Sequence, residues 1–73
     1  PSTLIKYDIS KAGKYSLIVY DALGNTVYKM VDNVLQPGSY EVEFNGAGLP
    51  SGIYFYRLSD GVNSLSKKLL MLK

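Results

Sequence analysis

The segment Ser39-Tyr40-Glu41-Val42-Glu43-Phe44 alternates polar residues with apolar or aromatic ones at every step. Successive side chains of a β-strand point to opposite faces of the sheet, so this pattern predicts a strand with one buried and one solvated face. Such strands are typical of antiparallel sheets, in which one face packs on a core and the other contacts water. We therefore expect Tyr40, Val42 and Phe44 to face inward.

Alternation of period two extends on both sides of this segment. Upstream, residues 4–9 and 15–20 alternate in the same way, and residues 26–31 are predicted as a third strand because they are rich in β-branched and aromatic residues. Glycine and Asp/Asn turn signals separate these segments. Downstream, residues 53–59 are nearly all apolar, which predicts a strand that is central in its sheet or covered on both faces, and residues 64–73 form a last strand. Six to seven short strands without helical spacing predict an all-β fold, an immunoglobulin-like antiparallel β-sandwich, with an open barrel as the alternative.

The length of 73 residues allows one domain, and that domain has few ways to stabilise itself. The chain has no cysteine for a disulfide and no histidine, so its stability must come from its 47% hydrophobic residues or from docking onto another domain or protein. It begins at Pro1 without a basic and apolar leader, and we expect residues 1–73 to be a single C-terminal domain excised from a larger exported protein. The longest apolar run, Leu69-Leu70-Met71-Leu72, is far shorter than a membrane-spanning helix.

The charge pattern argues against nucleic acid as a partner. The net charge is +2, and the basic residues are spread along the chain apart from Lys67, Lys68 and Lys73. A nucleic-acid-binding surface needs several cations on one face that contact phosphates together. We therefore expect no nucleic-acid interface.

No set of residues has the composition of a catalytic or metal site. A nucleophilic triad needs a base, and histidine, the usual one, is absent. Glu41 and Glu43 share the solvated face of their strand. A catalytic acid and base need different environments that separate their pKa values, and this exposed face offers none. The acids of Asp32-Asn33 and Asp60-Gly61-Val62-Asn63 are too sparse for calcium, and the glycine-rich loop at residues 46–48 lacks the Lys-Ser/Thr pair of a phosphate loop. We expect turn and loop roles for these residues, and no catalytic residue, metal or cofactor.

The tyrosines raise the question of a sugar-binding platform. Five of the seven fall on the inward side of the predicted strands, where a ring adds a large buried area to a small core: Tyr7, Tyr15, Tyr40, Tyr54 and Tyr56. Tyr20 and Tyr28 flank the turn predicted at residues 21–25 and are the candidates for exposure. A carbohydrate-binding module therefore remains an alternative, which the burial of these rings decides.

Several motifs, taken together, resemble those of one family. They are Pro1-Ser2-Thr3-Leu4-Ile5-Lys6-Tyr7, Tyr15-Ser16-Leu17-Ile18-Val19-Tyr20-Asp21-Ala22-Leu23-Gly24, Pro37-Gly38-Ser39-Tyr40-Glu41-Val42, Leu49-Pro50-Ser51-Gly52-Ile53-Tyr54-Phe55-Tyr56-Arg57-Leu58 and Lys67-Lys68-Leu69-Leu70-Met71-Leu72-Lys73. Their order along essentially the whole chain resembles the C-terminal sorting domain (type A) carried by cargo proteins of the type IX secretion system in Bacteroidetes. Each motif alone is unspecific, and the ordered set is specific.

The resemblance implies an immunoglobulin-like sandwich that serves as an address label and not as a catalyst. In this family the outer-membrane translocon recognises the folded domain, a sortase-like peptidase removes it, and the cargo is released or attached to surface lipopolysaccharide. The implied location is the medium or the cell surface, reached through the periplasm. By position, the resemblance implies structural roles in the first hairpin and the core strands for Tyr20, Asp21, Gly24, Gly38, Gly52, Tyr54 and Tyr56.

The last strand is the part of the chain that we expect the translocon to recognise. It combines a basic pair with alternating apolar residues: Lys67, Lys68, Leu69, Leu70, Met71, Leu72 and Lys73. At a sheet edge, its unpaired backbone groups would offer a template for β-augmentation by a partner, or for weak self-association. The competing interpretation is a last core strand whose lysines protect against aggregation. A spacer module, similar to the immunoglobulin-like domain of flagellar hook-capping proteins, is the remaining alternative function.

Overall fold

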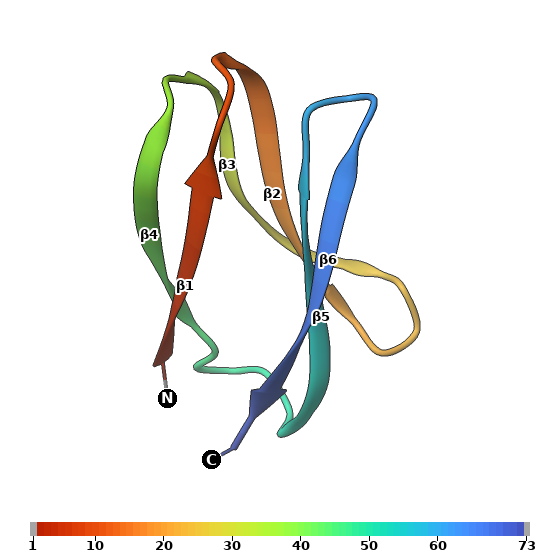
Figure 1. Ribbon diagram of the computed structural model, residues 1–73. Helices are drawn as coiled ribbons and strands as arrows, with labels where there is room; N and C mark the ends of the chain where they lie inside the picture. Colours follow the sequence, from red (N-terminus) through yellow and green to blue (C-terminus); the bar gives the residue numbers. More distant parts are fainter. Residues whose placement is uncertain (1, 73) are drawn as a thin grey trace.

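The fold consists of six β-strands in two sheets that face each other (Figure 1). The structure is a computed structural model that describes residues 2–72, and no helix able to span a membrane occurs among them. One sheet pairs β1 (Ser2–Ile9) with β4 (Gly38–Asn45), and the other has the order β3 (Thr26–Leu35), β2 (Gly13–Asp21), β5 (Gly52–Ser59) and β6 (Ser64–Met71). All pairs are antiparallel, which confirms the predicted all-β, immunoglobulin-like sandwich with six strands.

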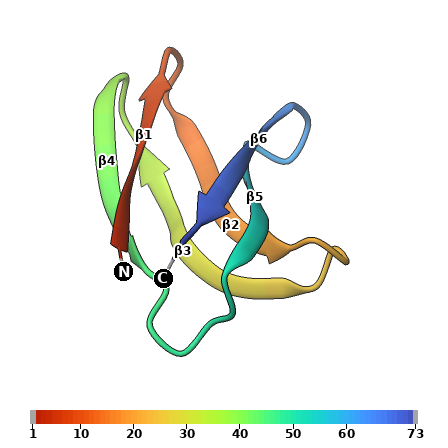
Figure 2. The same ribbon diagram turned by 90° about the horizontal axis from the view of Figure 1, so that it is seen from below.

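Three connections cross between the sheets, from β1 to β2, from β3 to β4 and from β4 to β5 (Figure 2). β1 and β4 are far apart in sequence but pair over their whole length, from Ser2 opposite Asn45 to Ile9 opposite Gly38. The pairs β2–β3 and β5–β6 are hairpins within the larger sheet. β6 therefore lies at one edge of that sheet, and β5 is its one neighbour in the described part of the chain.

The alternation in β4 places this strand over the core. Its predicted inward residues are buried or partly buried, and Phe44 is only 1% exposed, whereas Glu41 and Glu43 face solvent. β1 shows the same alternation of exposed and buried positions. Because opposite residues of paired strands share a face, the two strands present one apolar surface to the larger sheet. The prediction for residues 39–44 is confirmed.

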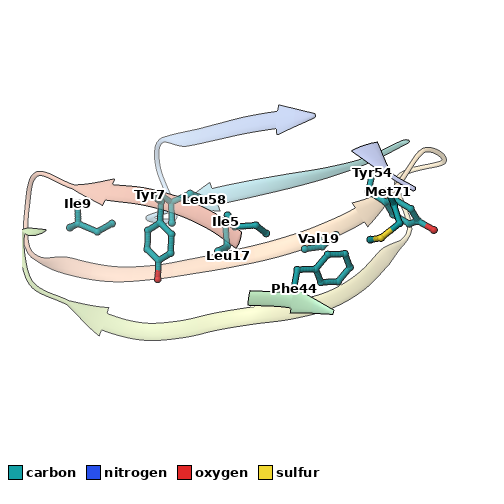
Figure 3. Close-up of a cluster of buried hydrophobic side chains, with 9 residues drawn as sticks. All are labelled: Ile5, Tyr7, Ile9, Leu17, Val19, Phe44, Tyr54, Leu58 and Met71. Carbon is teal, nitrogen blue, oxygen red and sulfur yellow. The ribbon is translucent and has the colours of Figure 1, made fainter. Parts of the chain in front are cut away.

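The core lies between the sheets and draws on five of the six strands (Figure 3). Its buried side chains are Ile5, Tyr7, Ile9, Leu17, Val19, Phe44, Tyr54, Leu58 and Met71. β3 adds only partly buried residues at its margin. Full burial of one large apolar side chain contributes about 1.5–3 kcal/mol to the free energy of unfolding. With so few buried side chains, the loss of one of them removes a large part of the stability of the domain.

Three tyrosines near the starts of strands share one hydrogen-bond arrangement. Each hydroxyl donates, over 2.7 Å, to the carbonyl oxygen four residues upstream: Tyr15 to Lys11, Tyr40 to Gln36 and Tyr54 to Pro50. In each case the strand begins two residues earlier, at Gly13, Gly38 or Gly52. The bond ties the turn before the strand to a ring at the core, as in the tyrosine corner of immunoglobulin folds. The bond gives the Tyr54 hydroxyl a structural partner, and Gly38 and Gly52 begin their strands with φ values of +156° and +154°.

The five tyrosines predicted to face inward are core residues. Tyr7 and Tyr54 are buried, and the other three are partly buried against the core. Tyr7 stacks on Tyr40 with ring centroids 5.5 Å apart and an interplanar angle of 12°. Burial, and secondarily the Tyr40 phenol beside it, raise the pKa of Tyr7 above its ordinary value. These rings therefore lie in the core or against it.

Two strands differ from their predictions. β5 is central in its sheet, as one alternative proposed, but it is not covered on both faces, because Ile53 and Phe55 are 44% and 38% exposed. β3 continues to Leu35 and not merely to residue 31. Its pairing with β2 shifts register twice, and such irregularities break the alternation by which a strand is recognised in sequence.

Candidate functional site

β6 is the predicted recognition strand, and its side chains divide between core and surface. Met71 is buried and Leu69 is partly buried, and both pack into the core. The other described members of the predicted signal are exposed: Lys67, Lys68, Leu70 and Leu72. Lys73 lies outside the described residues. The strand therefore combines a structural role with an exposed surface, carried by different residues.

The free backbone groups of β6 follow from its register with β5. Opposite residues of an antiparallel pair alternate between hydrogen-bonded and non-hydrogen-bonded pairs. The Asp60 amide donates to the Asn63 carbonyl oxygen over 3.1 Å, so the turn closes on a hydrogen-bonded pair. The register from this turn onward is unshifted, which places Ser66, Lys68 and Leu70 in non-hydrogen-bonded pairs. Their N–H and C=O groups therefore point away from β5, along the open edge.

The β2–β3 hairpin independently gives the same assignment of which β6 residues bond to β5 and which face the open edge. The Asp21 amide donates to the Asn25 carbonyl oxygen over 2.9 Å, so this amide points away from β5. Asp21 lies opposite Tyr54, which must then turn its own backbone groups toward Leu69 on β6. Leu69 is thus a hydrogen-bonded position, and its neighbour Lys68 faces the edge.

A groove separates the first half of β6 from β1. It has a volume of about 220 Å³, and residues of both strands line it, among them Asp8, Ile9 and Leu65. Leu65 is 55% exposed although it lies opposite the buried Leu58 on the inward face. The smaller sheet therefore leaves the start of β6 uncovered, and an additional strand at this edge would cover Leu65.

The end of β6 depends on a contact that the sequence analysis missed. Gly46, in the loop between β4 and β5, is buried against Met71, and a methyl group at this position would overlap the Met71 Sδ and Cε atoms. The loop role predicted for residues 46–48 is therefore incomplete, because Gly46 is also a packing residue. No sequence signal distinguishes a glycine that admits a neighbour from one that only bends the chain.

Asp21 organises the first hairpin turn. Its Oδ1 accepts hydrogen bonds from the amides of Leu23 and Asn25, both at 2.9 Å. Gly24 has a φ of +89°, in the left-handed region that glycine enters without steric cost. The bond from the Asn25 amide is the main cause that lowers the pKa of Asp21 below its ordinary value. Asp21 and Gly24 thus shape the β2–β3 turn through a side-chain acceptor and a left-handed backbone.

Asp60 repeats this arrangement in the β5–β6 turn. Its Oδ1 accepts hydrogen bonds from the amides of Val62 at 2.9 Å and Asn63 at 2.6 Å. These bonds, that of Asn63 first, lower the pKa of Asp60 below its ordinary value. Throughout residues 2–72, no three acidic side chains gather closely enough to hold a metal ion.

Acid is expected to weaken the domain through these two turns. A carboxyl whose pKa is lower in the folded than in the unfolded state contributes stability above its unfolded pKa, and this contribution is lost as the pH falls through the folded value. Because the unfolded value is about 4, we expect the thermal midpoint, followed by circular dichroism, to fall by several degrees below about pH 4. A protein with both Asp21→Asn and Asp60→Asn keeps the oxygen acceptors without the charge, and its melting should depend less on pH. An unchanged pH dependence would assign the acid sensitivity to other groups.

Of the two tyrosines expected at the surface, Tyr28 is exposed and Tyr20 is not. Tyr28 is 58% exposed and meets Phe44 edge-on at 6.5 Å. Tyr20 is partly buried, and the Arg57 guanidinium lies 5.3 Å from its ring centroid. Tyr28 lies opposite the buried Val19, whereas Tyr20 occupies the outer face of the sheet. The two rings therefore do not form one platform.

Comparison with known protein families finds a match that covers nearly the whole chain. The sequence model of the secretion system C-terminal sorting domain matches residues 3–72, a range that includes nearly all of the six strands. No curated protein and no solved structure matched the chain. Domains of this family are non-catalytic signals that direct the protein carrying them out across the outer membrane. The chain belongs to the family of type IX secretion system C-terminal sorting domains.

Proposed function

We propose that this domain carries an upstream cargo through the type IX outer-membrane translocon, and that β6 is the strand the translocon recognises. The observation that supports this proposal is the open edge of β6, where the backbone groups of Ser66, Lys68 and Leu70 have no neighbouring strand among residues 2–72. Natural proteins usually cover or shorten such edges because they promote aggregation. β1, β3 and β4 also have an open edge, so what favours β6 is its open edge together with the exposed basic pair Lys67 and Lys68.

Recognition proceeds by β-augmentation. A strand of the translocon pairs with the edge-facing backbone of β6, and its side chains alternate between the outer face, beside Lys68, and the groove, beside Leu65. Main-chain hydrogen bonds supply affinity that does not depend on the cargo. The same edge allows weak self-association of the free domain, which binding of the translocon displaces.

A sortase-like peptidase then removes the domain, and the cargo is released or attached to surface lipopolysaccharide. Peptidases need an extended segment free of other pairing, and β1 is paired with β4 from Ser2 onward. The cleavage site therefore precedes β1. The final location of the cargo is the medium or the cell surface.

Transfer of the domain to a passenger tests this function. Residues 1–73 are fused to the C-terminus of a reporter enzyme that carries an ordinary leader, in a bacterium with a type IX system. We expect most of the reporter activity outside the outer membrane, and nearly all of it in the periplasm when the translocon gene is deleted. A fusion that is folded but stays in the periplasm of the intact strain would contradict the proposal.

A further inference from the structure

The outer face of the four-stranded sheet is apolar across three strands. The register places Tyr20 opposite Phe55, and Ile53 opposite Leu70, so these side chains form neighbouring rows on one face. Ile53, Phe55 and Leu70 are 44%, 38% and 61% exposed. The smaller sheet packs on the opposite face and leaves them uncovered. A contiguous exposed apolar surface of this kind is typical of an interaction site.

Two cations lie within this apolar surface without a carboxylate partner. The Arg57 guanidinium stacks over Tyr20, and Lys68 lies opposite Phe55 on the next strand. Within the described part of the chain, the one ion pair lies elsewhere, between two residues of β3. Both cations are therefore available to carboxylates from outside the domain.

The other outer face of the sandwich has the opposite character. Asp8, Glu41 and Glu43 are exposed on the β1–β4 sheet, with Lys6 as the cation beside them. Among the described residues of that sheet, Leu4 is the one large apolar side chain that is exposed. An acidic and apolar partner would therefore be repelled by the β1–β4 face and attracted by the face of β2, β5 and β6.

A depression gives the apolar face a place for a side chain of the partner. It has a volume of about 400 Å³ and lies where the β2–β3 turn meets β5. Tyr20, Phe55 and Arg57 line it together with Leu23, which is 88% exposed, and Asp21. The Asp21 carboxylate accepts hydrogen bonds from the turn amides of Leu23 and Asn25. Aromatic and arginine side chains around a depression are the residue types that dominate the binding energy of protein interfaces.

We propose that this surface, the outer-face site, docks a protein partner whose contacting surface is apolar with carboxylates beside it. The outer-face site consists of Tyr20, Ile53, Phe55, Arg57, Lys68 and Leu70. An apolar side chain of the partner enters the depression, and its carboxylates pair with Arg57 and Lys68. The inference rests on the proposed function, because the partner belongs to the same translocon that pairs with β6. Two cations give too little attraction for a lipid or polysaccharide surface to bind through charge alone.

Binding of the full-length precursor to the purified, detergent-solubilised translocon, measured by surface plasmon resonance, tests this inference. Arg57→Glu and Phe55→Thr are the test variants, because both positions are exposed and threonine suits a strand. Lys11→Glu, in the exposed β1–β2 turn, introduces the same charge change and is the matched control. We expect each test variant to bind about 30-fold more weakly or worse, and the control to bind as the unaltered protein does. Arg57→Glu should also make binding less dependent on salt.

The outcomes separate this inference from the proposed function. The thermal midpoint of each variant confirms that it is folded. If Lys68→Pro, which blocks the β6 edge, loses binding while Arg57→Glu and Phe55→Thr bind normally, the outer-face site is refuted and recognition of β6 stands. If the unaltered precursor does not bind the translocon, both proposals fail. If the test variants bind the translocon normally but lose retention on anionic lipopolysaccharide, a polysaccharide and not a protein occupies this face.

Discussion

Replacing Phe44 with alanine is expected to unfold the domain. The side chain is 1% exposed between the two sheets, and its ring meets that of Tyr28 at an angle of 77°. Truncating a buried phenylalanine to alanine costs about 3–5 kcal/mol, through lost burial and the cavity left behind. At about 0.05–0.15 kcal/mol per residue, a domain of this length has about 4–11 kcal/mol of stability in total. A domain this small without a cysteine to form a disulfide belongs near the low end, so the substitution removes most of its stability.

Urea denaturation followed by circular dichroism measures this effect. Leu23→Ala is the control, because Leu23 is 88% exposed in the β2–β3 turn and its loss should change the free energy of unfolding by less than about 0.5 kcal/mol. Phe44→Leu keeps an apolar side chain in the same place and should lie between the two. If Phe44→Ala unfolds at the same urea concentration as the unaltered domain, the packing of the two sheets does not depend on this residue.

The two-layer fold is predictable from the sequence because one face of the β1–β4 sheet is exposed to solvent, which produces a regular alternation of polar and apolar residues. In β4, Glu41 and Glu43 alternate with apolar residues, and only a half-buried strand satisfies both kinds of side chain. The roles of Asp21 and Gly24 are equally local, since a turn uses its own backbone groups. These features depend on neighbours within a few residues, which is the information that a sequence states directly.

The open outer face of β5 was not predictable in the same way. Ile53 and Phe55 are the residue types expected under a second layer, and the structure leaves them exposed. Apolar composition shows that a surface is suited to contact, but it does not show whether the contact is made within the chain or with a partner. The outer-face site therefore emerges only when the tertiary structure shows which surfaces remain uncovered.

The exposed edge of β6 is only partly predictable from the sequence. Its basic and apolar residues were identifiable, but the sequence does not state which strand lies at an edge or which amides face outward. The backbone amide of Lys67 faces β5 and that of Lys68 faces the open edge. This difference follows from the alternation of hydrogen-bonded pairs, which starts at the bond from Asp60 to Asn63. The packing of Met71 against Gly46 brings together segments that are far apart in sequence, and no local sequence pattern predicts this contact.

Substituting proline for Lys68 is expected to abolish export while leaving the domain folded. The Lys68 amide points to the open edge, so its loss breaks no hydrogen bond between β5 and β6. A partner strand needs this donor in the middle of the edge, and the proline ring occupies the space where that strand would lie. Deleting residues 67–73 is a weaker test, because it also removes the buried Met71, and unfolding alone would stop export.

Two matched variants separate the effect of blocking the β6 edge from the effects of losing the Lys68 charge and of destabilising the fold. Lys68→Thr removes the charge but keeps the amide, so its export should fall far less than that of Lys68→Pro. Lys67→Pro places the same ring at a position where the backbone amide faces Tyr56 on β5. Loss of this hydrogen bond should cost about 1–3 kcal/mol of folding stability. The measurements are the fraction of full-length precursor outside the outer membrane and the thermal midpoint of each purified domain. Normal export of Lys68→Pro would show that the translocon does not add a strand to β6, and recognition would then depend on side chains other than Lys68, such as Phe55 and Arg57.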